Sequence, residues 1–209
     1  MKTAELIDRL AANPAPVRSA ANTLGFGVAS GALVSFAMMV IWLGFRPDLA
    51  DAAGTWGYWL KFFYPLALAA IALRSAARLA RPGTSGRAGW EFLPLVFVAA
   101  AAAAQWMNTP DAQHWHLLMG KSSSACPWRI VALSLPLLLG TFWAMRRLAP
   151  TRPVLAGAAA GVFAGAAGAW IYAFACTETS AVFLAVWYTA GIALTGLLGA
   201  LLGRWALRW

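Results

Sequence analysis

Two cysteines, Cys126 and Cys176, are the residues of this chain best suited to chemistry, because a thiolate is both a nucleophile and a ligand of soft metal ions. Cys126 lies in the stretch SSSACPWR, and the only two histidines, His114 and His116, precede it in the same segment. Two Cys and a His-x-His pair would suffice for a tetrahedral metal site. Their spacing matches no compact zinc motif, so the histidines are auxiliary candidates only.

Three interpretations of the cysteine pair stay open on the residues alone. The first is a structural disulfide, and the second is a relay that exchanges disulfides, for which the chain lacks a C-x-x-C motif. The third is sensing, in which a soft metal ion or an oxidant changes the thiols and thereby shifts helix packing. We expect neither an enzymatic active site nor a resident cofactor, and a soft metal ion enters only as a transient signal.

The elements that carry these thiols are membrane helices. Apolar residues make up 61% of the 209 residues and charged residues only 11%, which is too apolar for a soluble domain of this size. Six stretches approach the roughly 20 residues that a helix needs to cross a bilayer. They are residues 24–43, 56–76, 90–106, 128–145, 154–174 and 182–202. The sequence therefore predicts an all-α polytopic membrane protein, with an N-terminal segment (1–23) and a six-helix transmembrane domain (24–209).

The distribution of positive charge predicts the orientation. Twelve of the sixteen Lys and Arg residues fall in alternate segments that include both termini, and three fall in the segments between them. By the positive-inside rule both termini are cytoplasmic, in a bacterial inner membrane, and both cysteines face outward. Because membrane orientation explains the net charge of +9, we expect no direct binding of nucleic acid. Lys61, about one turn inside the second span, is expected to snorkel to the outer interface.

The N-terminal segment predicts a short amphipathic helix. Leu6, Ile7 and Leu10 fall on one helical face, and two interpretations stay open for it. The helix either lies on the inner surface of the lipid bilayer or docks a cytoplasmic partner.

Small residues at four-residue spacing predict close helix packing. Gly27 and Gly31 form one such step, Gly157 and Gly161 a second, and Gly199 and Gly203 a third. Packing within one chain explains these steps, and a homodimer would use the same motif.

Several blocks of the sequence together resemble the NrsF family of integral-membrane anti-sigma factors. They are MKTAELIDRLAA, CPWRIVALSLP, RRLAPTRPVLAGAAAGVFAG and FACTETS. The resemblance implies a six-span inner membrane protein that sequesters an extracytoplasmic function sigma factor at the cytoplasmic face. It also implies that Cys126 and Cys176 respond to metal or oxidative stress, and it favours Leu6, Ile7 and Leu10 as the sigma-factor contact.

The alternative function is a small-molecule or metal-ion membrane transporter. Transporters usually carry ionisable groups near the bilayer midplane, and we place no acidic residue at that depth. Transport therefore ranks second.

Overall fold

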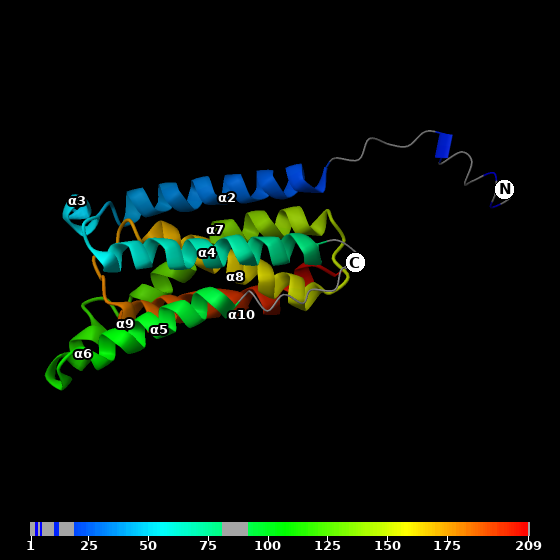
Figure 1. The fold of residues 1–209 in the computed structure, drawn as a ribbon. Coiled ribbons are helices and arrows are strands. Elements are labelled where there is room, and N and C mark those ends of the chain that lie inside the picture. The colour runs from blue at the N-terminus through cyan, green and yellow to red at the C-terminus, as the bar shows by residue number, and fades with distance from the viewer. Residues whose placement is uncertain (1–2, 4, 6–10, 13–18, 81–91, 209) are drawn as a thin grey trace.

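The computed structural model describes residues 3, 5, 11–12, 19–80 and 92–208, and in these ranges long helices run back and forth along one axis (Figure 1). Five helices are long and apolar enough to cross a membrane. They are α2 (Ala20–Trp42), α4 (Trp56–Leu79), α7 (Cys126–Arg146), α8 (Pro153–Tyr172) and the continuous helical stretch Ala181–Ala206. The predicted all-helical architecture of a membrane protein is confirmed at this level.

The third predicted span appears as a shorter helix, α5 (Leu93–Met107), of 15 residues. At about 1.5 Å per residue it reaches about 22 Å, less than the roughly 30 Å of a hydrocarbon core. Residues 81–91, which include the predicted start of this span, lie outside the described residues, so a sixth crossing stays a prediction. Another short helix, α6 (Asp111–Met119), lies in the segment between the third and fourth predicted spans, which was expected to be an outer loop.

The last membrane helix begins with an irregular stretch. Its parts are α9 (Ala181–Phe183), the π-helix η2 (Leu184–Tyr188) and α10 (Thr189–Ala206). Gln105 of α5 caps its start, because the Gln105 side-chain oxygen accepts a hydrogen bond from the Ala181 N–H at 2.7 Å. A π-helical turn widens the helix locally and is often found at functional sites.

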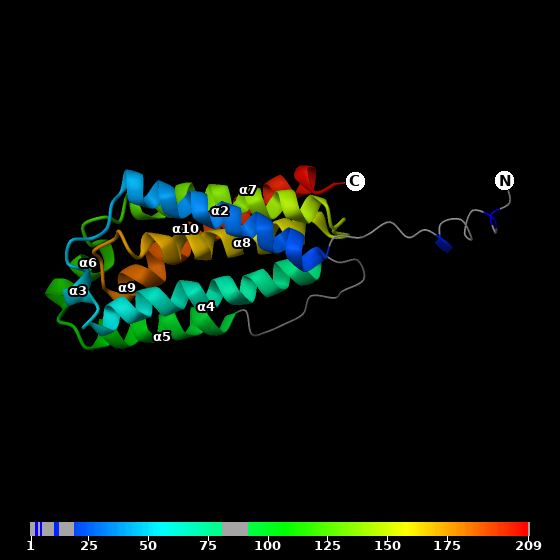
Figure 2. The ribbon, with the colours of Figure 1, turned by 90° about the horizontal axis from the view of Figure 1, so that it is seen from above.

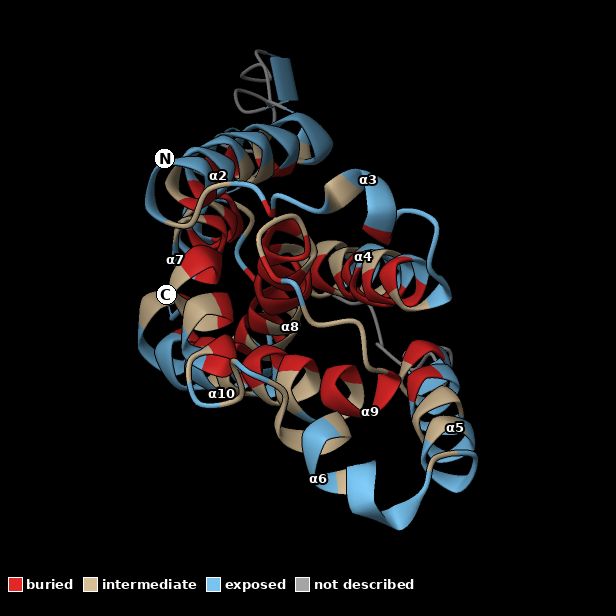
Figure 3. Cartoon of the chain, turned by 90° about the vertical axis from the view of Figure 1, so that its left-hand side faces the viewer, coloured by how far each residue is buried: buried red, intermediate tan, exposed pale blue. Residues whose placement is uncertain are grey.

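Helix α8 lies at the centre of the bundle, with α2, α4, α7 and α10 around it (Figure 3). Its most extensive contact is with α10, where Gly157 lies against Gly199 and Gly161 against Thr195. A methyl group at any of these glycines would meet backbone atoms of the other helix. The glycine steps therefore pack helices within the chain, as the sequence predicted.

The bundle is elongated, and the long helices start and end at its two ends (Figures 1 and 2). Helix α7 begins and α8 ends at the first, which we call the cysteine end. Helix α2 begins and α10 ends at the other, the basic end, which carries a set of exposed arginines: Arg74, Arg78, Arg146, Arg147, Arg152, Arg204 and Arg208. Which end faces the cytoplasm stays a prediction.

Candidate functional site

Both cysteines are buried at the cysteine end, and both are free thiols. Cys126 is the first residue of α7 and is fully buried, and Cys176, four residues after α8 ends, is 4% exposed. Helices α7 and α8 pack against each other, and Cys126 begins the one while Cys176 follows the other, so both cysteines lie at the same end of this helix pair. The structure thus brings together two residues that are 50 positions apart in the sequence.

Cys176 lies in a short connection, residues 174–178, that we call the strap. The main-chain carbonyl groups of the strap follow the C-terminus of α8 and are left without helical partners. Arg46, 4% exposed, supplies some of the missing partners. Its main-chain N–H donates to the Phe174 carbonyl at 3.0 Å, and its guanidinium donates to the Cys176 carbonyl at 3.2 Å. A cation at the C-terminus of a helix also complements the helix dipole.

Lys61 of α4 is the second cation on the strap. Its ammonium donates to the Cys176 carbonyl at 2.6 Å and to the Glu178 carbonyl at 2.8 Å, and it lies 5.5 Å from the centre of the Tyr188 ring. The whole residue is inaccessible to solvent. The expectation that Lys61 snorkels to the interface is therefore wrong, because these carbonyls bind the ammonium inside the protein.

Asp48 neutralises Arg46 but not Lys61. The Asp48 carboxylate accepts two hydrogen bonds from the Arg46 guanidinium, at 2.8 and 2.7 Å. These bonds lower the pKa of the Asp48 carboxyl to about 2 and raise the pKa of Arg46. Lys61 instead donates hydrogen bonds to two main-chain carbonyls.

Glu178 connects the strap to the segment that leads into Cys126. One Glu178 carboxylate oxygen accepts a hydrogen bond from the Lys121 main-chain N–H at 2.6 Å. The same oxygen lies 3.5 Å from the Ser122 hydroxyl, which donates to it. The strap is consequently held on one side by α4 and Arg46, and on the other by the chain just before α7.

Two buried tyrosines line the same region. Tyr188, in the π-helix, is fully buried, and its hydroxyl has no hydrogen-bond partner in the described part of the chain. Its ring centre lies 5.9 Å from that of Tyr172, whose hydroxyl accepts a hydrogen bond of 3.4 Å from Arg129. A buried hydroxyl without a partner is costly, so Tyr188 adds a polar group that this site has not satisfied.

The two histidines do not join the cysteines. His114 stacks on Trp106 with ring centres 4.0 Å apart, and its Nε2 atom lies 2.9 Å from the Thr109 carbonyl. His116 is exposed on α6. Within the described ranges, no three His, Cys, Asp or Glu side chains form a group that could hold a metal ion. The structure therefore offers a soft ion two thiols rather than a preformed tetrahedral site.

The N-terminal contact residues cannot be placed, since Leu6, Ile7 and Leu10 lie outside the described residues.

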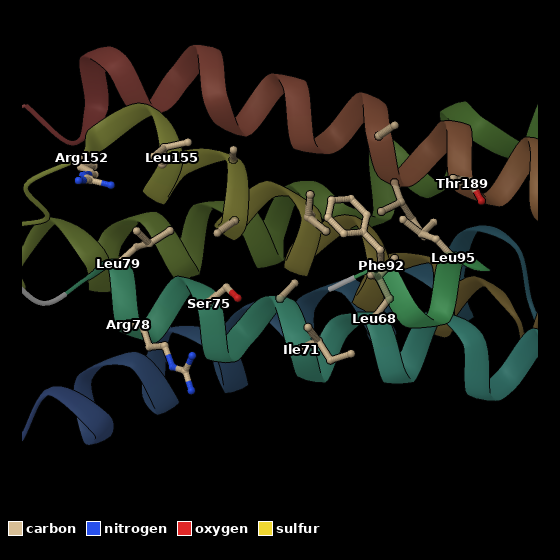
Figure 4. Close-up of a pocket in the computed structure, with 16 residues that line it drawn as sticks. Leu68, Ile71, Ser75, Arg78, Leu79, Phe92, Leu95, Arg152, Leu155 and Thr189 are labelled. Carbon is tan, nitrogen blue, oxygen red and sulfur yellow. The ribbon is translucent and has the colours of Figure 1, made fainter. Parts of the chain in front are cut away.

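The basic end adds a groove to its exposed arginines. The groove has a volume of about 380 Å³ and lies between α4, α5, α8 and α10. Apolar side chains such as Leu68, Ile71 and Leu155 line it, and Arg78 and Arg152 lie where it approaches the basic end (Figure 4). The basic end thus combines exposed cations with a recessed apolar surface.

The sequence analysis missed Arg46, Lys61 and Glu178 as parts of the site. One signal for Lys61 was present, because an ionisable residue inside a membrane-length apolar run is by default a candidate functional residue. Arg46 and Glu178 carry no such signal, since they lie in connections and their partners are main-chain atoms distant in the sequence.

Comparison with known proteins decides the family. Residues 10–209 match the family model NrsF, described as negative regulator of sigma F. The chain belongs to the NrsF family. It is 42% identical to the anti-sigma-F factor NrsF of Caulobacter vibrioides (strain NA1000 / CB15N), over 100% of both chains. It is 36% identical to the probable anti-sigma-F factor NrsF of Azospira oryzae (strain ATCC BAA-33 / DSM 13638 / PS), again over the full length of both. No solved structure matches this NrsF family member.

Proposed function

We propose that this protein is a membrane-embedded anti-sigma factor that holds an extracytoplasmic function sigma factor at the inner membrane. Metal or oxidative stress outside the membrane, sensed by Cys126 and Cys176, releases the sigma factor. The single observation that carries the regulatory role is the full-length similarity to two curated anti-sigma-F factors. The membrane part of the proposal is supported by the five apolar helices.

The basic end is the proposed sigma-factor side. Its arginines are exposed, whereas Arg46 and Lys61 at the cysteine end are buried in hydrogen bonds. The excess of positive charge supports the proposal that this end is cytoplasmic, by the positive-inside rule. Exposed cations attract acidic surfaces and speed encounter, and an apolar helix face supplies affinity. In this proposal Leu6, Ile7 and Leu10, in the segment that precedes α2, supply that face.

The cysteine pair is the proposed sensor. Two thiols can bind a soft metal ion as thiolates, with release of their two protons to water, or they can lose two electrons to an oxidant and two protons to water and join as a disulfide. Either event changes the contact between the start of α7 and the strap. Release then follows as a population shift between two packings, and a signal that moves the equilibrium from mostly bound to mostly released must favour one packing by about 5 kcal/mol.

The first experiment replaces both cysteines. A Cys126→Ser, Cys176→Ser variant should still insert into the membrane and still repress a sigma-dependent reporter, because serine keeps the size of each side chain. It should no longer respond to metal or oxidant. Ser124→Ala, an exposed neighbour, is the matched control and should respond normally. A full response of the double variant would remove the sensor role.

The second experiment tests the contact surface. Deleting residues 2–12 should abolish copurification of the sigma factor, because the deletion removes the apolar face of Leu6, Ile7 and Leu10. A Leu6→Asp, Leu10→Asp variant keeps the length of the segment and should have the same effect. Unchanged copurification in both would assign the contact to the other segments of the basic end.

A further inference from the structure

Lys61 lies at the point where the strap, the cysteine pair and α4 meet. Its ammonium binds the Cys176 and Glu178 carbonyls at 2.6 and 2.8 Å, so it holds the strap at the cysteine itself and two residues further on. Residues bound at two points by short, charge-assisted hydrogen bonds are strongly restrained. The position of Cys176 in the strap therefore depends on a side chain from another helix.

Burying the Lys61 ammonium costs free energy, which its interactions inside the protein must offset. A buried ammonium needs either an opposite charge or a full set of acceptors. Arg46 has the Asp48 carboxylate, whereas Lys61 in the described part of the chain has two carbonyls and the face of Tyr188. An apolar residue in this place would leave the strap carbonyls of Cys176 and Glu178 with one cation fewer. The lysine thus satisfies a strap that has no helix or sheet to bind it.

The same helix also connects this point to the rest of the bundle. One turn after Lys61, the Tyr64 hydroxyl lies 2.8 Å from the Thr189 hydroxyl at the start of α10. Helix α4 then continues to Arg74 and Arg78 at the basic end. A movement of the strap that pulls on Lys61 would consequently act on a helix that ends among the exposed arginines.

We propose that Lys61 is a positioning residue of the cysteine pair, which fixes the Cys176 strap against α4 and passes a change at the thiols to that helix. The part of the proposal in which a change at the thiols is transmitted along α4 to the basic end rests on the proposed function. The part in which Lys61 positions Cys176 does not. The two parts are therefore tested by different measurements on the full chain in lipid nanodiscs.

The positioning is measured by cross-linking. A bis-methanethiosulfonate reagent with a one-carbon spacer joins two thiols only when they are close, and intact mass separates the cross-linked product from singly modified thiols. Most of the modified wild-type protein should be cross-linked. In Lys61→Met and Lys61→Gln the ratio of cross-linked to singly modified protein should fall about fivefold, as expected for losing about 1 kcal/mol of restraint. Lys61→Arg, which keeps the charge, should restore most of it.

Lys121→Met is the matched control, because Lys121 lies on the same end but contributes only its main-chain N–H. It should cross-link as the wild type does. The use of two uncharged variants guards against one of them failing to fold. An unchanged cross-linked share in Lys61→Met or Lys61→Gln would overturn the positioning role, even if the cysteines control the sigma factor.

The passage to α4 is measured by sigma-factor retention after the thiols have been modified. In wild type, modification should release bound sigma factor, and in Lys61→Gln the same extent of modification should release several times less. If thiol modification releases nothing in the wild type, the proposed function fails while the cross-linking result stands. Equal release from both proteins would instead exclude Lys61 from the route.

Discussion

The two ends of the bundle use the same residue types in opposite ways. At the cysteine end, Arg46 and Lys61 are buried, and both donate hydrogen bonds to main-chain carbonyls of the strap. At the basic end the arginines are exposed, and two of them, Arg147 and Arg204, lie over the neighbouring tryptophans Trp143 and Trp205. The cations Arg46 and Lys61 bind main-chain groups inside the protein, whereas the arginines of the basic end carry positive charge on its surface.

In the proposed function, the signal alters the cysteine end and the sigma factor binds the basic end. Hydrogen bonds at the cysteine end tie the strap that carries Cys176 to α4 and to the segment before α7. Within the described ranges, the long helices connect the basic end to this network. Substitutions at the two ends should therefore have different consequences for stability and for partner binding.

The largest effect on stability is expected from Arg46→Met. This change removes guanidinium hydrogen bonds to the Cys176 and Thr177 carbonyls and leaves Asp48 without its partner. We expect a loss of about 2–4 kcal/mol, measured by unfolding in mixed micelles. Arg147→Met, the control at the basic end, should cost at most about 1 kcal/mol, because an exposed contact with a tryptophan is weak. If both variants lost the same free energy of unfolding, the proposed difference between the two ends would be wrong.

A smaller effect is expected from Glu178→Ala. The carboxylate holds the Lys121 N–H at 2.6 Å, so its removal should cost about 1–2 kcal/mol and free the chain before Cys126. Hydrogen exchange at the Lys121 amide should become much faster. Glu178→Gln retains an acceptor at the same place and should protect this amide better than alanine does.

At the basic end, Arg146→Gln with Arg204→Gln should leave stability within about 0.5 kcal/mol, since both residues are exposed. Binding of the sigma factor should weaken and lose part of its salt dependence, because charge at an interface rim mainly affects encounter. A titration of sigma factor at two salt concentrations measures both effects. A large loss of stability here would show that these arginines are structural.

The smallest effect is expected from acid. In the folded protein the pKa of Asp48 is about 2, below its ordinary value of 3.8, because Arg46 donates to the carboxylate. A carboxyl group whose pKa is lowered on folding stabilises the folded protein when the pH is above the ordinary pKa of that group. This contribution is lost as the pH falls toward 2. Melting temperatures at about pH 5 and about pH 2.5 should therefore differ more in wild type than in Asp48→Asn. An equal difference in both proteins would mean that the pair contributes nothing.

The membrane helices could be read from the sequence because lipid imposes simple rules on length, apolarity and charge. Predicted and observed bounds agree within a few residues for α4, α7 and α8, and the glycine steps pack as expected. The third span was predicted from residue 90, whereas α5 begins at Leu93, with Pro94 in its first turn.

The network around the strap could not be read in the same way. Lys61 was expected at the interface, since its depth in the span allowed its long side chain to reach water. Its actual partners are main-chain carbonyls 115 and 117 positions away. Every residue has such a carbonyl, so residue types alone do not reveal these partners. The location of both cysteines at one end followed from topology, whereas their burial and their anchors depend on tertiary packing.

The central claim is that chemistry at the cysteine end controls binding at the basic end. The most direct test uses the purified full chain in nanodiscs with bound sigma factor, and adds Zn(II) or the thiol oxidant diamide while the bound fraction is recorded. The account predicts that the wild type releases the sigma factor and that the Cys126→Ser, Cys176→Ser variant retains it. Retention by the wild type under both treatments, or equal release from both proteins, would contradict the claim.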